Sequence, residues 1–396
     1  MKKVLFVLLL ICFASAVVFS GTEEIDVYRY LYRNSEKNID QLDILQNMAE
    51  AKLTGAGEFY AWALRQLVLR YKNILASKDR DATTEKYAAD EQAKILAALL
   101  GAEKYTPAAA DLWYVVDGFT DPLVKAEALM ALGKIRATNY LPQIIRVLDN
   151  LNLTPTKDPD DGGRIAFGAI ISLEKFQDPS GYLSVFLASV GWYPQRIKTQ
   201  AAKSLPFIAK DPSPFMLNLI KSPKYEYPIK LVALQTIEKT NVDNRNKSEI
   251  AVAALDEGHK AATGDVKLRG TIADMRKLAL DMIRRYRSTD GTVYLLMRKS
   301  YTNRDSDQQE KIAAINAIAA QKTDAAAELL SEFLTTLNAR YSTLNQEETQ
   351  IIRVLIPALG NTGRPSARTA LTQVTRLDYT SGIKNLATQA LNQIPN

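Results

Sequence analysis

The sequence predicts an all-α protein, an α-α superhelix in which about ten helical hairpins stack as a solenoid. Two observations support this fold class. Residues 121–150 have the pattern of two short amphipathic helices joined by a few residues, and the apolar positions of this pattern recur down the chain. A pair of short helices cannot bury its shared apolar face alone, so the pattern requires neighbouring pairs.

The segment 121–150 shows how one repeat is built. Asp121 is a favourable N-cap, and Pro122 follows at the first helical position, where a missing N–H costs nothing. Val124, Ala128 and Leu132 then fall on one apolar stripe of a helix. A break at residues 138–139 precedes a second apolar helical pattern, so the segment is predicted to be one helical hairpin.

The repeat register is set by an anchor residue in an A-L-x-A-L type of pattern. The residue four places after the anchor is apolar in all eight repeats, and the residue four places before it is apolar in all but one, Glu310. The residue three places before is basic in six of eight, and we interpret this basic ladder as ion pairs between adjacent repeats. Ala63 and Leu96 fit the register more weakly and extend the count to about ten hairpins. The eight anchors are Ala128, Ala169, Ala201, Ala233, Ala279, Ala314, Leu355 and Ala387.

The D-P-x-V-K-x-x-A-x-x-A-L-G sequence of residues 121–133 resembles the HEAT repeat family, in its short, PBS-lyase-like variety. The resemblance covers residues 57–396. It implies a HEAT/ARM-like solenoid of stacked helix pairs and a role in binding other macromolecules. Residues 21–56 do not fit the repeat and are predicted to form an N-terminal helical cap, because a solenoid needs an end unit that covers its first apolar face.

The first twenty residues have the pattern of a signal peptide. Lys2 and Lys3 precede an apolar run, and small residues at 14–16 and 18–20 allow cleavage after Ala16 or after Ser20. The chain is therefore predicted to be exported, to a periplasmic or extracellular location, with no transmembrane span in the mature chain. A retained anchor helix and lipidation at Cys12 are the alternatives.

The remaining composition argues against several kinds of chemistry. Cys12 is the sole cysteine, so the mature chain has no thiol for a disulfide or a metal. His259 is the sole histidine, and we interpret it as a surface residue of a polar insertion, residues 257–270. The acidic turn at residues 158–163 lacks the ligands of a calcium loop. We predict no enzymatic activity, no cofactor and no metal site.

Aromatic residues at the joints between repeats are the first candidate for a binding surface. Tyr193, Tyr225 and Tyr379 each lie eight residues before an anchor, so equal positions could form a strip along one edge. Large rings with a polar group are enriched at binding hot spots. The alternative is that each ring packs under the next repeat. The candidate protein-binding residues are Trp192, Tyr193, Tyr225, Tyr227 and Tyr379.

A basic region at residues 260–304 is the second candidate. It holds eleven basic residues and four acidic ones, whereas the chain without Lys2 and Lys3 has 48 basic and 44 acidic residues, a balance that predicts no nucleic-acid partner. Such a region suits an anionic polymer or lipid headgroups, and the alternative is a solvated face with local ion pairs. The candidate anion-binding residues are Arg276, Lys277, Arg284, Arg285, Arg287, Arg298 and Lys299.

Together these patterns predict an exported, non-enzymatic helical-repeat scaffold or adaptor that mediates protein–protein interaction in the cell envelope. The partner's identity does not follow from the sequence. The alternative is a binding module for an anionic envelope polymer or lipid headgroups through residues 260–304.

Overall fold

The computed structural model describes residues 21–288 and 290–395, and these contain twenty α-helices and no strands. The all-α solenoid prediction is confirmed. The predicted signal peptide, residues 1–20, lies outside the described residues. No helix of the described part of the chain is long and apolar enough to cross a membrane.

The chain forms two compact units, residues 1–210 and 211–396, which are described separately. The helices of unit 1 are α2 (Gly21–Asn34), α3 (Asn38–Glu50), α4 (Gly57–Ala76), α5 (Ala82–Glu103), α6 (Ala109–Gly118), α7 (Pro122–Lys134), α8 (Leu141–Leu153), α9 (Pro159–Phe176), α10 (Tyr182–Val190) and α11 (Gln195–Ile208). Those of unit 2 are α12 (Ser213–Lys221), α13 (Tyr227–Lys239), α14 (Asn244–Lys260), α15 (Val266–Tyr286), α16 (Val293–Thr302), α17 (Gln308–Ala320), α18 (Asp324–Asn338), α19 (Gln346–Thr362), α20 (Arg368–Arg376) and α21 (Ser381–Asn392).

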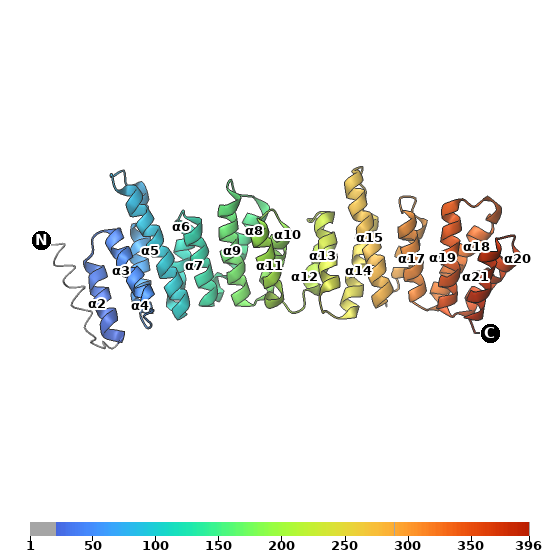
Figure 1. Ribbon diagram of the computed structural model, residues 1–396, viewed down its shortest axis with the longest axis horizontal. Coiled ribbons are helices and arrows are strands. Elements are labelled where there is room, and N and C mark those ends of the chain that lie inside the picture. The colour runs from blue at the N-terminus through green and yellow to red at the C-terminus, as the bar shows by residue number, and fades with distance from the viewer. Residues whose placement is uncertain (1–20, 289, 396) are drawn as a thin grey trace. The chain divides into compact units, whose positions relative to one another are not determined.

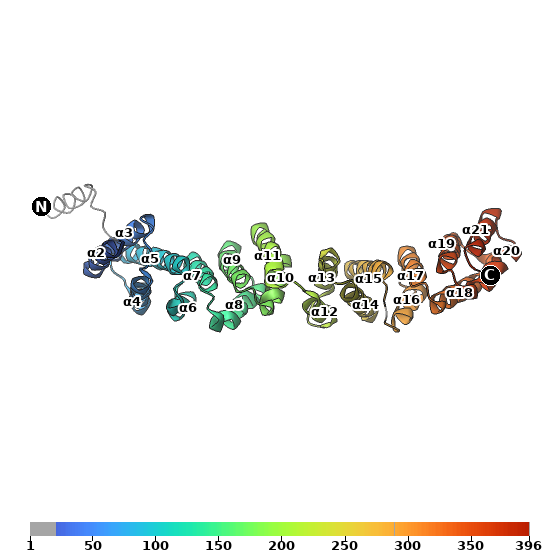
Figure 2. The ribbon, with the colours of Figure 1, turned by 90° about the horizontal axis from the view of Figure 1, so that it is seen from below.

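Within each unit the helices form two layers, which Figure 1 shows from one side and Figure 2 after a quarter turn. In unit 1, one layer contains α3, α5, α7, α9 and α11, each packed on the next. In unit 2, the corresponding layer contains α13, α15, α17, α19 and α21, again each packed on the next. We call this the anchor layer of each unit, because all eight anchors lie on these helices. The anchors are fully buried, so the repeat register describes the interior of the stack.

The helix pairing differs in one respect from the prediction. Helix α7 packs against α5, α6 and α9, and α8 packs against α9 and α10, so each anchor helix pairs with the helix before it in the chain. The prediction that residues 121–150 form one hairpin is therefore wrong in its pairing, although both helices form. Asp121 caps α7 as predicted, and its Oδ1 accepts hydrogen bonds from the backbone N–H groups of Leu123 (2.8 Å) and Val124 (3.1 Å).

Ala63 does not mark a repeat. It lies on α4, in the second layer, whereas Leu96 lies on α5, in the anchor layer. The spacing matched because α4 is itself amphipathic and buries Leu64 and Leu67, so the same helical period occurs in the wrong layer. The first hairpin is instead α2–α3, within residues 21–56, which keeps ten hairpins in the described chain.

Ion pairs between adjacent repeats confirm the interpretation of the basic ladder at three positions. Lys230 Nζ lies 3.0 Å from Glu257 Oε2, and Lys311 Nζ lies 3.3 Å from Glu347 Oε1. Arg276 and Glu310 form a bidentate pair with both N–O distances at 2.8 Å. Glu310 is the one polar residue in a column of apolar ones, and this buried arginine explains why.

Glycines allow a close approach between helices α7 and α9 in unit 1. A Cβ atom at Gly168 would lie 2.5 Å from the carbonyl oxygen of Ala126, and one at Gly133 would lie 2.5 Å from Cα of Ser172. Both neighbours are backbone atoms, which cannot move aside cheaply. The spacing of these two helices therefore depends on the missing side chains.

Candidate functional site

Trp192 and Tyr193 are part of the interior packing of unit 1. The rings stack with centroids 4.3 Å apart, Trp192 Nε1 donates to the carbonyl oxygen of Leu151 (2.8 Å), and the Tyr193 hydroxyl donates to Asn152 Oδ1 (2.9 Å). Tyr193 is 2% exposed, and its burial raises the pKa of the hydroxyl. The prediction that Tyr193 contacts a partner is therefore wrong, because its ring fills the joint between two hairpins.

The same correction applies to Tyr379 in unit 2. This residue is 8% exposed, and its hydroxyl donates to Asn338 Oδ1 at 3.0 Å. Tyr225 and Tyr227 are half-buried, with Lys224 Nζ 5.8 Å from the first ring centroid. The contact role of these two tyrosines and of Trp192 stays a prediction, but Tyr193 and Tyr379 cannot belong to an exposed aromatic strip.

The basic region of unit 2 is largely neutralised by carboxylates that come from outside residues 260–304. Arg276 is 7% exposed and pairs with Glu310, so it cannot meet an external anion. Arg298 binds Glu332 through two contacts of 2.5 and 2.6 Å. Lys277 Nζ lies 3.1 Å from Asp274 and 3.5 Å from Asp307. The count along the sequence missed Asp307, Glu310 and Glu332 because they are neighbours of these cations only in the folded chain.

The four remaining candidates differ in whether their charged groups already have partners in the folded chain. Arg284 and Arg285 both pair with Asp281, and Arg285 also binds Glu238. Lys299 is exposed and donates to the carbonyl oxygen of His259 (3.2 Å). Arg287 is exposed and has no ion-pair or hydrogen-bond partner for its side chain within the described residues. Of the seven predicted anion-binding residues, Arg287 and Lys299 therefore have no ion pair within the described residues, and Arg287 also has no hydrogen-bond partner for its side chain.

His259 lies in the last turn of α14, because α14 extends to Lys260 and most of the expected polar insertion is helical. The side chain is half-buried, and its Nε2 lies 2.8 Å from Ser300 Oγ. Burial, followed by the nearby charges of Arg276 and Lys299, lowers the pKa of His259 from 6.5 to about 4. The interpretation of His259 as a surface residue is therefore wrong, because the side chain is half-buried and the imidazole is neutral near pH 7.

Stability is expected to decrease as the pH falls from about 6.5 to about 4, because the unfolded chain then binds a proton at His259 that the folded chain excludes. The contribution is at most roughly 1 kcal/mol per pH unit, because the partly exposed ring is partly screened by solvent. His259→Gln should flatten the dependence of the melting temperature on pH relative to wild type. Equal slopes for the two proteins between these pH values would contradict this account.

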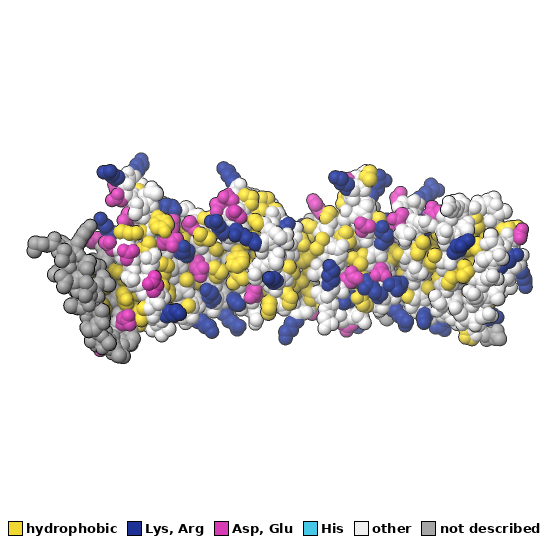
Figure 3. Space-filling model, viewed as in Figure 1, with side chains coloured by type: hydrophobic (Ala, Val, Ile, Leu, Met, Phe, Trp, Pro, Cys, Tyr) yellow, Lys and Arg dark blue, Asp and Glu magenta, His cyan; other side chains and the backbone are white. Residues whose placement is uncertain are grey.

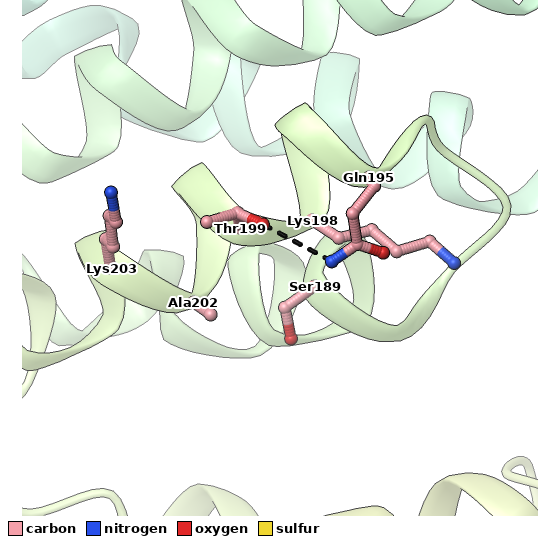
Figure 4. Close-up of a pocket in the computed structure, with 6 residues that line it drawn as sticks. All are labelled: Ser189, Gln195, Lys198, Thr199, Ala202 and Lys203. Atoms are coloured by element: carbon pink, nitrogen blue, oxygen red, sulfur yellow. Dashed lines mark hydrogen bonds between the residues drawn. The ribbon is translucent and has the colours of Figure 1, made fainter.

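One hollow in unit 1, of about 440 Å³, lies where α10 ends and α11 begins (Figure 4). Its one internal hydrogen bond joins Gln195 Nε2 to Thr199 Oγ1 at 3.3 Å. Lys198 and Lys203 extend in different directions, so the polar groups do not converge on a common point. We assign no chemistry to this hollow.

A second hollow, of about 670 Å³, lies where α5, α7, α9 and α11 end in unit 1, and we call it the corner groove. The buried residues Gly101 and Gly133 are part of its lining, and the side chain of Lys134 lies against Gly101. Its cations are Lys104, Lys134, Arg136 and Lys175, and its other side chains are Glu174, Gln177 and Phe207. Lys and Arg atoms gather along the corresponding edge of unit 1, the lower edge in Figure 3.

Residues with a left-handed backbone conformation follow the ends of α5, α7 and α9 beside this groove, and we call these positions its corners. Lys104 (φ 54°), Arg136 (φ 53°) and Gln177 (φ 57°) each lie eight residues after the anchor of their helix. Non-glycine residues pay roughly 1 kcal/mol for this conformation, and glycine is the usual choice at a helix end. In unit 2, Gly363 (φ 64°) takes the same position after Leu355, whereas Arg287 and Lys322 take it after their anchors.

Sequence reasoning missed the corner groove because it compared the repeats at no position more than four places after the anchor. The offset eight places after the anchor carries a basic residue in four repeats: Lys104, Arg136, Arg287 and Lys322. The recurrence of basic residues at this offset could be found in the sequence. Their left-handed backbone conformation could not, because a basic residue does not indicate a positive φ as glycine does.

Comparison with known proteins bears on the repeat alone. Residues 124–150 match the PBS lyase HEAT-like repeat, which confirms the resemblance found in the sequence. No curated protein matches the chain. A crystal structure of an engineered protein is 13% identical and covers 95% of this chain and 99% of its own, with a TM-score of 0.31.

Proposed function

We propose that the protein is an exported, non-enzymatic helical-repeat scaffold that binds another protein in the cell envelope. The observation that carries this proposal is the two-layered stack of five hairpins in each unit. Such a stack places equivalent residues of successive repeats side by side on a continuous surface, which suits an extended partner. The same stack fills its interior with apolar side chains and leaves its polar groups at the edges.

The alternative, a binding module for an anionic polymer or lipid headgroups, has less support. Ion pairs occupy most of the cations of residues 260–304, and exposed ion pairs have little charge left for an outside ligand. Five of the eleven cations have no ion pair within the described residues, and five exposed charges make a weaker electrostatic footprint than the full set: Lys267, Arg269, Arg287, Lys299 and Arg304.

Photo-crosslinking in cells of the source organism tests the scaffold proposal. A photoreactive phenylalanine analogue replaces one of three exposed residues in turn: Tyr114 and Phe207 in unit 1, and Leu295 in unit 2. After illumination, at least one of the three positions should give a discrete adduct with a single partner protein. No adduct should form in the dark. If all three positions give only a diffuse background, the scaffold proposal is contradicted.

Export predicts a shortened chain outside the cytoplasm. Intact-mass measurement of the protein from the envelope or medium should give a chain that begins at residue 17 or at residue 21. Placing two Asp residues in the apolar run of residues 4–13 should keep the full-length chain inside the cell. A chain of full length in the cytoplasm in both cases would contradict export.

A further inference from the structure

We infer that the corner groove of unit 1 binds an acidic peptide segment of a protein partner. The inference rests on the proposed scaffold function and names the partner's chemistry. The groove crosses the ends of four consecutive anchor helices, so it can hold an extended chain. All of its lining belongs to unit 1, and its cations Lys104, Lys134 and Arg136 are exposed.

The charges of the groove are available to a ligand. Lys104 and Arg136 are exposed, and neither has an ion-pair or side-chain hydrogen-bond partner within the described residues. Lys134 Nζ lies 3.7 Å from Glu127, a long contact that an incoming carboxylate can replace. These three cations lie at the ends of two neighbouring helices, Lys104 after α5 and Lys134 and Arg136 at the end of α7, so carboxylates spaced along a peptide can each meet one.

The conformation of the corners gives an independent reason. Lys104 and Arg136 adopt a left-handed backbone in which glycine would be relaxed, and Gly363 shows that this fold accepts glycine at that position. A cation near a helix C-terminus has some favourable interaction with the helix dipole. Gln177, however, adopts the same conformation without a charge, so the turn itself does not require one.

Two features favour a peptide over a uniform polyanion such as a phosphate polymer. Glu174 lies in the groove, where Ser204 Oγ (2.7 Å) and Lys175 Nζ (3.3 Å) hold its carboxylate, and it repels a ligand that is charged at every unit. Phe207 is 59% exposed at one end of the groove and offers contact to an apolar side chain. A peptide of mixed Glu and apolar residues satisfies both features.

Fluorescence anisotropy with a labelled Glu-rich peptide that contains one Leu tests the inference on the purified chain. The double variant Lys104→Gly/Arg136→Gly should bind the peptide roughly three- to tenfold more weakly, from two lost exposed charge pairs. Its melting temperature should not fall, because glycine relaxes both corners. Added salt should weaken binding by wild type.

Lys322→Gly is the matched control, because Lys322 has the same left-handed corner position in unit 2 (φ 54°) and lies outside the groove. It should leave peptide affinity unchanged. Equal affinity for wild type and the double variant, or an equal loss in the control, overturns the inference. Tighter binding of polyphosphate than of the peptide also overturns it and points to a phosphate polymer.

A lowered melting temperature of the double variant calls for Lys104→Gln/Arg136→Gln, which keeps long side chains while removing both charges. The same loss of affinity supports the inference, and full affinity overturns it. Crosslinks of the double variant to the wild-type partner at an undiminished yield would overturn the groove inference and leave the scaffold proposal intact. Absence of crosslinks in wild type would instead overturn the scaffold proposal.

Discussion

Glu310→Ala is expected to destabilise unit 2 by about 3–5 kcal/mol, because it leaves the guanidinium of Arg276 buried without its carboxylate. Glu310 is 0% exposed and Arg276 is 7% exposed, and the pair is bidentate. The carbonyl oxygen of Gly258 accepts a further bond from Arg276 at 3.2 Å but cannot neutralise the charge. Urea unfolding followed by far-UV circular dichroism should show the loss as an earlier transition.

The double variant Arg276→Met/Glu310→Leu is the control for this result. Apolar residues of similar volume remove both charges together, so most of the lost stability should return. An unfolding midpoint for Glu310→Ala close to that of wild type would contradict the ion-pair account. A double variant as unstable as Glu310→Ala would show that shape, and not charge, is what Glu310 supplies.

Gly168→Ala is expected to destabilise unit 1 by about 1–3 kcal/mol, near the upper end of that range. The added methyl group would lie 2.5 Å from the carbonyl oxygen of Ala126 and 2.7 Å from its Cα, so α7 and α9 would have to separate. Because α7 also packs on α5 and α6, the strain cannot be relieved at one interface. The melting temperature of the variant measures the effect.

Gly270→Ala serves as the comparison. Gly270 lies on α15, and beyond its chain neighbours and the nearby backbone of its own helix a Cβ atom there would meet no atom within 4 Å. Alanine should therefore stabilise the helix by roughly 0.5–1 kcal/mol relative to glycine. Opposite shifts at two helical glycines would separate the effect of packing from that of helix propensity. A Gly168→Ala protein as stable as wild type would refute the close approach of α7 and α9.

Much of the fold follows from the sequence, because the repeat register depends on local periodicity. Each anchor residue is buried, and Asp121 caps its helix as expected. The pairing of helices could not be predicted in the same way. An apolar stripe indicates that one face of a helix is buried, but it does not indicate the layer to which the helix belongs. The stripe of α4 around Ala63 has the same period as that of α5 around Leu96, and only the contacts between helices assign each one to its layer.

The candidate site was less predictable, for a related reason. Tyr193 and Tyr379 have the sequence features of contact residues, but each hydroxyl finds an asparagine partner about forty residues away, and that partner accounts for the polar group without any ligand. In the same way, the apparent excess of positive charge in residues 260–304 is reduced by Glu310 and Glu332, which form ion pairs with Arg276 and Arg298. Composition in a window counts charges but cannot count their neutralisation by distant segments.

The helix pairing also has a consequence for how the chain folds. Within each unit, the helices pack on those one or two places away in the chain, so every unit forms from short-range contacts. Folds dominated by such contacts close small loops and reach the native state quickly. A chain that emerges N-terminus first from a ribosome or a translocation channel can therefore complete α4–α5 on α3 while α21 is still inside. Assembly can then advance one hairpin at a time, without waiting for a distant segment.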